Sequence, residues 1–444
     1  MAHGNTNRMV PQVRRIDGKD LHLYYHHNGD DTMLIMLEAI MDQDVDGDAL
    51  SQAVRDAERR YTAFGCGLAT TGRGLCYRSL ETTARAFEDV PGKRWLLGTE
   101  DTAGRLYRVT YDGPRITVSL HHGLTDGRGA FEYLKTLLYY YLVALGNSVD
   151  ACGKVLLAGD VPQNEDEYPC LKYGKRIDQG NATAPGATQL FGIDEDYLDE
   201  HGEYLCRHVE LTAPADAVVL AARNAQVTVT SLLIAAVDRA VGCAYHPKDE
   251  IVLCCVTTDL RPLFGTSTMQ NFSGVSIIAE VPQMRSMPIE TEAQALGQQL
   301  ATSHNKDAAL GKLSEHLEEM ERLETTPVDE LFGNEDALMM EKRGVRSKLA
   351  SLLTNVGVVD LPSDVQQHVR QASFRIPSFS ATMSIAVATC GDTLTLQVTH
   401  PFKNEAFSHA LAETLTQLGI PTRLSDRGLE AYDILGREAV VDLT

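Results

Sequence analysis

Apolar runs alternate along the chain with segments whose apolar residues recur every three or four positions. Continuous apolar runs are typical of buried strands, whereas a spacing of three or four is typical of amphipathic helices. Residues 34–41 are largely apolar, and in the polar segment that follows, Leu50, Val54 and Ala57 fall on one helical face. The order of such segments predicts an α/β protein.

The same patterns predict most of the remaining elements. Strands are expected at 105–111, 115–120, 207–211, 251–257, 274–281, 352–359, 381–389 and 393–399. Helices are expected at 49–62, 131–145, 213–225, 228–241 and 405–418, and across most of 300–323. The histidine-containing segment 21–26 is interpreted as a strand, and the tail that follows the last helix is short.

A polar stretch divides the chain into two parts of similar size. Between residues 159 and 192 the periodicity fades, and proline and glycine recur. We therefore expect two α/β lobes, with residues 1–175 in the first, 176–205 as a crossover linker and 206–444 in the second. A chain of 444 residues is long enough to bury a core in each lobe.

Composition narrows the range of functions and locations. A formal charge of −21 argues against nucleic-acid binding, which requires a basic surface. The most apolar stretches are shorter than the roughly 20 residues that cross a bilayer, and the polar start does not resemble a signal peptide. The nine cysteines show no C-x-x-C spacing, as expected for reduced thiols. We expect a cytoplasmic monomer that does not insert into a membrane.

The run His121-His122-Gly123-Leu124-Thr125-Asp126-Gly127 carries the clearest chemical signal in the chain. It lies between a predicted strand and a predicted helix, where loops often present functional groups. A neutral histidine accepts protons near pH 7, and a nearby carboxylate suits a tight loop that holds a cation. Acyl transfer from a thioester needs such a base for the acceptor, together with donors for the tetrahedral oxyanion.

This run resembles the H-H-x-x-x-D-G motif of the chloramphenicol acetyltransferase-like superfamily, which includes peptide condensation domains. The resemblance covers nearly the whole chain. Within the superfamily, the chain most resembles stand-alone alcohol O-acetyltransferases and polyketide-associated acyltransferases. It implies two lobes, each a mixed sheet flanked by helices, with an active-site channel between them. It also implies that His122 is the general base, while His121, Asp126 and Gly127 have structural roles.

Three shorter strings add to the resemblance. Asp259-Leu260-Arg261-Pro262 and Asn271-Phe272-Ser273-Gly274 resemble the D-L-R-P and N-x-x-G elements of the alcohol acetyltransferase and condensation branches. Thr354-Asn355-Val356-Gly357 resembles the S-N-x-G strand of the former branch. The resemblance implies a salt bridge between Asp126 and Arg261. Asn271, Ser273 and Asn355 are candidates for binding the substrate or the oxyanion.

The resemblance implies transfer from acyl-CoA to a hydroxyl, or alternatively an amine, of a small molecule. Neither an acyl-enzyme nor a permanently bound cofactor is expected. The D-F-G-W-G element of plant BAHD enzymes is absent, and no carrier or adenylation domain is fused. Two alternatives stay open: a condensation-type enzyme that takes a phosphopantetheine thioester from a carrier protein, and a non-catalytic binding protein. The presence of His122 and Asp126 argues against the second alternative.

No metal site is predicted from the sequence. His22 and His26 have the H-x-x-x-H spacing, but on a strand that spacing places the rings too far apart to share an ion. Other histidines show no partner pattern and are expected to be surface or core residues: His304, His316, His368, His400 and His409. No H-E-x-x-H string and no glycine-rich nucleotide-binding string occurs.

Overall fold

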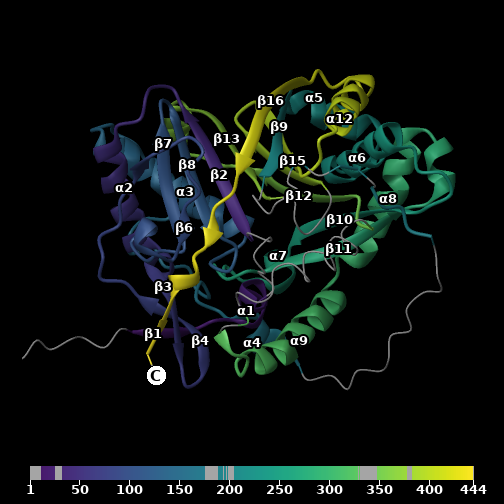
Figure 1. Cartoon of the computed structure of the whole chain (residues 1–444). Helices are drawn as coiled ribbons and strands as arrows, with labels where there is room; N and C mark the ends of the chain where they lie inside the picture. Colours follow the sequence, from purple (N-terminus) through teal and green to yellow (C-terminus); the bar gives the residue numbers. More distant parts are fainter. Residues whose placement is uncertain are drawn as a thin grey trace, which may run out of the picture.

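The computed structural model describes residues 12–25, 33–175, 189–193, 195–196, 198, 205–328, 330, 348–377 and 383–443. Two large sheets dominate these parts of the chain, and helices pack against both of them (Figure 1). The predicted fold class, α/β with two lobes of mixed sheets flanked by helices, is confirmed. Most of the expected linker lies outside the described residues, so the proposed lobe boundaries stay a prediction.

The first sheet is built mainly from the N-terminal part of the chain. Its strands in spatial order are β13 (Val369–Arg375), β2 (Leu34–Met41), β8 (Arg115–His121), β7 (Tyr107–Asp112) and β5 (Phe87–Glu88). Helices α2 (Gly47–Arg60) and α3 (Gly127–Ala144) share one core with these strands. Leu50, Val54 and Ala57, which the sequence places on one helical face, are all buried in that core.

The second sheet belongs to the C-terminal part. Its strands in spatial order are β11 (Ser273–Glu280), β10 (Val252–Asp259), β12 (Ser351–Val358), β14 (Ser384–Cys390), β15 (Thr393–His400), β9 (Leu205–Pro214) and β16 (Arg423–Ala431). Its helices are α5 (Ala215–Asn224), α6 (Val229–Tyr245), α8 (Ile289–Ser303) and α12 (Ala406–Gln417), which gather beside it in Figure 1. The sheet is mixed, because β12 runs parallel to both of its neighbours whereas the other pairs are antiparallel.

Late segments of the chain return to the N-terminal elements. Strand β13 pairs antiparallel with β2, so the first sheet takes an edge strand from the C-terminal part. The last strands also pair with early ones, β17 (Ile434–Leu435) with β6 (Leu96–Leu97) and β18 (Val440–Asp442) with β3 (Cys66–Thr71). The yellow end of the chain in Figure 1 follows this path. The tail therefore ties the two parts together, a role that the sequence analysis did not predict for a short tail.

Two helical regions differ from the sequence interpretation. The strand expected at 21–26 is wrong, because Gly18–Tyr25 forms helix α1 and residue 26 lies outside the described residues. Leu21, Tyr24 and Tyr25 are buried with helical spacing, but two turns are too short for that period to be evident in the sequence. The helix expected within 300–323 is the end of α8 followed by α9 (Lys306–Leu323).

Among the described residues, no single helix is long and apolar enough to cross a membrane. One bent pair, α5 with α6 at 89°, reaches the length and apolar content of a span when the two are taken together. The apolar residues of α6 are buried in the core of the second sheet.

Candidate active site

The histidine motif occupies the turn between β8 and α3. Strand β8 ends at His121, and the Asp126 side chain caps α3 by accepting a hydrogen bond from the Gly129 N–H at 3.1 Å. An aspartate at this position satisfies a backbone N–H that the first helical turn leaves without a partner. Gly127 is the first residue of α3 and lines a cavity between the two sheets. The predicted strand–loop–helix setting of the motif is therefore present.

The expected salt bridge between Asp126 and Arg261 is present. Two guanidinium nitrogens of Arg261 donate to the two carboxylate oxygens of Asp126 at 2.9 and 3.0 Å, and both side chains are buried. The Phe272 N–H donates to the same carboxylate at 2.8 Å. Burial raises the pKa of Asp126, but Arg261 and these donors outweigh burial and hold the pKa at about 2. Asp126 is thus a carboxylate whose acceptors are fully used by the protein.

Arg261 also holds the backbone of the segment that follows α7 (Arg261–Phe264). Two of its remaining N–H groups donate to the carbonyl oxygens of Thr268 and Gln270 at 2.7 and 3.0 Å, and a third donates to the carboxylate of Asp259 at 3.0 Å. The hydroxyl of Thr125 donates to the carbonyl oxygen of Met269, which lies between Thr268 and Gln270, at 2.7 Å. The motif loop and the segment before β11 are therefore fastened to each other at several points.

His121 and His122 are adjacent in the chain but have different surroundings. The ring of His121 is fully buried and stacks on Tyr24, with ring centroids 4.4 Å apart. Its Nδ1 accepts a hydrogen bond from the Gly123 N–H at 3.0 Å. A side chain at Gly123 would lie 2.5 Å from the Tyr24 ring, so this close approach requires glycine. His121 packs against the protein, as the resemblance implied.

His122 lines the cavity. The cavity has a volume of about 350 Å³ and is bordered by both sheets and by α1. Nδ1 of His122 is buried, and the described residues offer it no hydrogen bond of normal geometry. Burial and the charge of Lys19 lower the pKa of His122. Hydrogen bonds with nearby backbone groups and the charge of Asp126 raise it, but by less. A lowered pKa keeps the imidazole neutral at pH 7, as a general base requires.

Lys19 is a cavity residue that the sequence analysis missed. It lies on α1, and its ammonium group donates to the carbonyl and hydroxyl oxygens of Ser273 at 2.5 and 2.8 Å. Burial lowers the pKa of this amine. Nothing in the sequence singled it out, because the pattern predicted no element at residue 19 and a lone lysine is usually a surface residue.

The three candidate binding residues have different positions. Ser273 and Asn355 line the cavity, whereas Asn271 is not among the lining residues. The amide nitrogen of Asn271 donates to Asp20 and to the carbonyl oxygen of His122, each at 2.6 Å. The amide nitrogen of Asn355 donates to Thr230 at 3.1 Å. Asn271 therefore holds the backbone of His122, while Ser273 and Asn355 face the space that a substrate would fill.

No protein-family model and no curated protein sequence matches the chain. Its structure resembles polyketide synthase associated protein 5 from Mycobacterium tuberculosis at a TM-score of 0.58, with 13% identity over 91% of this chain and 98% of that one. TRI101 from F. sporotrichioides, solved with coenzyme A and T-2, gives a TM-score of 0.58, with 10% identity over 94% of this chain and 100% of that one. The chain has the chloramphenicol acetyltransferase-like fold.

The same fold appears in TRI3 trichothecene 15-O-acetyltransferase from Fusarium sporotrichioides, at a TM-score of 0.59 and 12% identity over 94% of this chain and 96% of that one. It also appears in the epimerization domain from the third module of tyrocidine synthetase B, at a TM-score of 0.54 and 14% identity over 93% and 96%. At such identities the likeness concerns the fold, so the chemistry must be argued from the residues of this site.

Proposed function

We propose that this chain is an acyltransferase that moves an acyl group from acyl-CoA to the hydroxyl of a small-molecule acceptor. The observation that carries the proposal is the placement of His122, a buried histidine of lowered pKa, in a cavity of about 350 Å³ between the two sheets. Structures with this fold include a trichothecene 15-O-acetyltransferase and a complex with coenzyme A, which supports a thioester donor.

In this mechanism His122 takes the acceptor's proton while the acceptor oxygen attacks the thioester carbonyl. Because Nδ1 is buried, we assign the proton transfer to Nε2. The tetrahedral intermediate collapses, the carbon–sulfur bond breaks, and the proton passes from His122 to the departing thiolate of CoA. No bond to the protein forms at any stage. A positioned base of this kind contributes about 10²–10⁴-fold to the rate.

The cavity offers polar groups for the developing oxyanion and for orienting the substrates. The ammonium group of Lys19 and the hydroxyl of Ser273 meet each other at the cavity wall, and Asn355 lines it on β12. Donors of this kind stabilise a tetrahedral oxyanion when they are fixed before reaction. Asn271 contributes by fixing the His122 backbone rather than by contacting substrate.

The donor, the acceptor class and the location complete the proposal. Acyl-CoA is the co-substrate, O-acylation is preferred to N-acylation, and a carrier-bound phosphopantetheine thioester is the alternative donor. All nine cysteines lie in described segments and are free thiols, which supports a reducing compartment such as the cytoplasm.

Release of free thiol from a panel of acyl-CoAs, from acetyl to palmitoyl, tests the proposal. The panel is run with mixed small alcohols and amines, using wild type, His122→Ala and a control, His409→Ala, which changes an exposed histidine on α12. We expect acceptor-dependent thiol release by wild type and the control and its loss in His122→Ala. No release by folded wild type with any combination would overturn the acyl-CoA donor, and equal release by all three proteins would remove His122 from the mechanism.

A further inference from the structure

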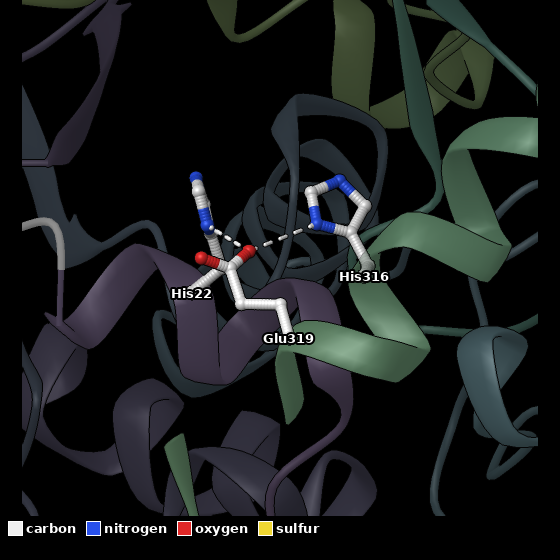
Figure 2. A group of neighbouring side chains, drawn as sticks. All are labelled: His22, His316 and Glu319. Atoms are coloured by element: carbon white, nitrogen blue, oxygen red, sulfur yellow. Dashed lines mark hydrogen bonds and ion pairs between the residues drawn. The ribbon is translucent and has the colours of Figure 1, made fainter. Parts of the chain in front are cut away.

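A second group of chemically active side chains lies outside the cavity, where α1 crosses α9. His22 comes from α1, and His316 and Glu319 come from α9 (Figure 2). One carboxylate oxygen of Glu319 lies 2.6 Å from Nδ1 of His22 and 3.8 Å from Nδ1 of His316. In Figure 2 this carboxylate points between the two imidazole rings. Two imidazoles and one carboxylate thus converge on a single point.

The two helices approach closely enough to form this group because of two features of the sequence. His316 and Glu319 are three residues apart, so they share one face of α9. On α1, a side chain at Gly18 would lie 2.6 Å from the carbonyl oxygen of His316, so only glycine permits the contact. His22 lies one turn after Gly18 and therefore reaches the same face of α9.

The dimensions of the group suit a small divalent ion. The three ligand atoms lie within 4.8 Å of one another. Zinc binds imidazole nitrogen and carboxylate oxygen at about 2.0–2.2 Å in tetrahedral geometry, which places its ligand atoms about 3.3 Å apart. The two imidazole–carboxylate separations of 2.6 and 3.8 Å lie on either side of that value, and the two imidazole nitrogens lie no more than 4.8 Å apart. Shifts of about 1.5 Å or less would therefore bring the three atoms to zinc geometry.

The side chains are also accessible to an ion from solvent. Their exposed fractions are 29% for His22 and 22% each for His316 and Glu319, so water can reach the group and supply a fourth ligand. Arg322 pairs with the other oxygen of Glu319 at 3.2 Å, so the two oxygens of this carboxylate face different partners. The nearby cation inside the protein is Lys19. After burial, its charge is a further cause that lowers the pKa of His316.

We propose that His22, His316 and Glu319 form a binding site for a zinc-type divalent transition-metal ion that fastens α1 to α9. Imidazole and carboxylate in tetrahedral arrangement are ligands that zinc prefers. The ion replaces the hydrogen bond between His22 and Glu319 with two metal–ligand bonds. Helix α1 also carries Lys19 and Leu23, which line the catalytic cavity. The ion thereby stabilises one wall of the cavity without contacting the substrates.

The sequence alone excluded this site for a reason that the fold corrects. In the sequence, His26 on an expected strand was the only candidate to share a metal ion with His22, and His316 showed no partner pattern. In the structure the segment is helical and its partners come from residues almost 300 positions later. A ligand set that is split between two distant helices has no local spacing to reveal it.

Titration of the metal-free protein with Zn²⁺, monitored by calorimetry, tests the proposal. We expect one tight equivalent in wild type and in His409→Ala, and binding weaker by about tenfold or more in His22→Ala and His316→Ala. Glu319→Gln should also weaken binding. Glutamine has nearly the same shape as glutamate, so this variant is the least prone to misfolding. The proposal would be overturned if the three variants bound Zn²⁺ as tightly as wild type does, or if wild type bound no tight equivalent.

Two further readouts exclude binding at the thiols, of which Cys152 and Cys243 are exposed. Co²⁺ bound at the proposed site should show visible absorption bands without a thiolate-to-cobalt charge-transfer band. Zn²⁺ should raise the melting temperature of wild type but not of Glu319→Gln, because an ion that binds only the folded state stabilises it. A thiolate band, or equal thermal shifts in the two proteins, would contradict the site. Neither readout depends on acyltransferase activity.

Discussion

The two ends of the loop from His121 to Gly127 differ in how the protein surrounds their polar side chains. Asp126 accepts hydrogen bonds from Arg261, Phe272 and Gly129, and its pKa is held at about 2. His122, four residues earlier, faces a cavity, and its pKa is lowered by burial and by Lys19. A side chain whose hydrogen-bond acceptors are all occupied by the protein can stabilise the structure but cannot also bind a substrate. A neutral base beside an open space is poised for chemistry.

The comparison extends to the two histidines. His121 stacks on Tyr24 and its Nδ1 accepts a backbone N–H, so its ring is committed to packing. His122 contributes its backbone to the scaffold instead, since its carbonyl accepts from Asn271 and its N–H donates to Met33. The protein thus fixes the main chain of His122 while its ring remains on the cavity wall. If structural and chemical roles are divided in this way, substitutions at the two kinds of residue should have different effects on activity and stability.

The largest expected effect is the loss of activity in His122→Gln. Glutamine is similar in size but cannot accept a proton at neutral pH, so kcat/KM should fall about 10²–10⁴-fold. The free energy of unfolding should change little, because the ring borders an open cavity. Steady-state kinetics and urea unfolding measure the two effects. The division of roles would be contradicted if the free energy of unfolding fell so far that loss of folded protein accounted for the fall in kcat/KM.

The next effect is the destabilisation caused by Asp126→Asn. This change removes the buried carboxylate that pairs with the guanidinium of Arg261, and the loss of a buried partner typically costs about 3–5 kcal/mol. Asp259→Asn is the matched control, because Asp259 contacts the same Arg261 at 3.0 Å but its side chain is 38% exposed. That change should cost no more than about 1 kcal/mol. Equal losses in urea unfolding would show that the buried pair has no special structural role.

The pH dependence of stability should also report on Asp126. Its pKa is about 2 in the folded protein, against about 4 for an ordinary aspartate. A depressed folded-state pKa stabilises the native state above the unfolded value, and this contribution is lost as pH falls toward the folded value. The difference in unfolding free energy between wild type and Asp126→Asn should therefore narrow between pH 4 and pH 2. A difference that stays constant over that window would contradict the assigned pKa.

A smaller effect is expected from Lys19→Met. Lys19 lowers the pKa of His122, so its removal should raise that pKa. Because protonated His122 cannot act as a base, the acidic limb of the kcat/KM profile should move to higher pH. Lys306→Met on the exposed start of α9 is the control and should leave the profile in place. An unchanged acidic limb in Lys19→Met would mean that His122 does not set it.

Much of the fold could be predicted because the main elements have strong periodic patterns. Leu34–Met41 is a largely apolar run and forms β2 with those bounds, and α2 shows its buried face in the spacing of its apolar residues. Helix α1 has only two turns, and its burial comes from neighbours distant in the sequence. Strand β13 and the tail strands form through such partners as well, so local pattern did not reveal them.

The candidate site was partly predictable for a similar reason. The motif is local, so His122, Asp126 and their strand–loop–helix setting follow from seven consecutive residues. The Asp126–Arg261 pair followed only from the resemblance, because 135 positions separate its members. Lys19 and the His22–His316–Glu319 group depend on where α1 lies in three dimensions. Sequence spacing carries no information about that placement.

The most direct test of the account measures kcat/KM and unfolding free energy together for His122→Ala and Asp126→Asn. The account predicts that His122→Ala loses acceptor-dependent thiol release while keeping nearly wild-type stability. It predicts that Asp126→Asn loses several kcal/mol of stability, with residual thiol release in the fraction that stays folded. Wild-type thiol release by His122→Ala, or a loss of stability in it as large as in Asp126→Asn, would contradict the account.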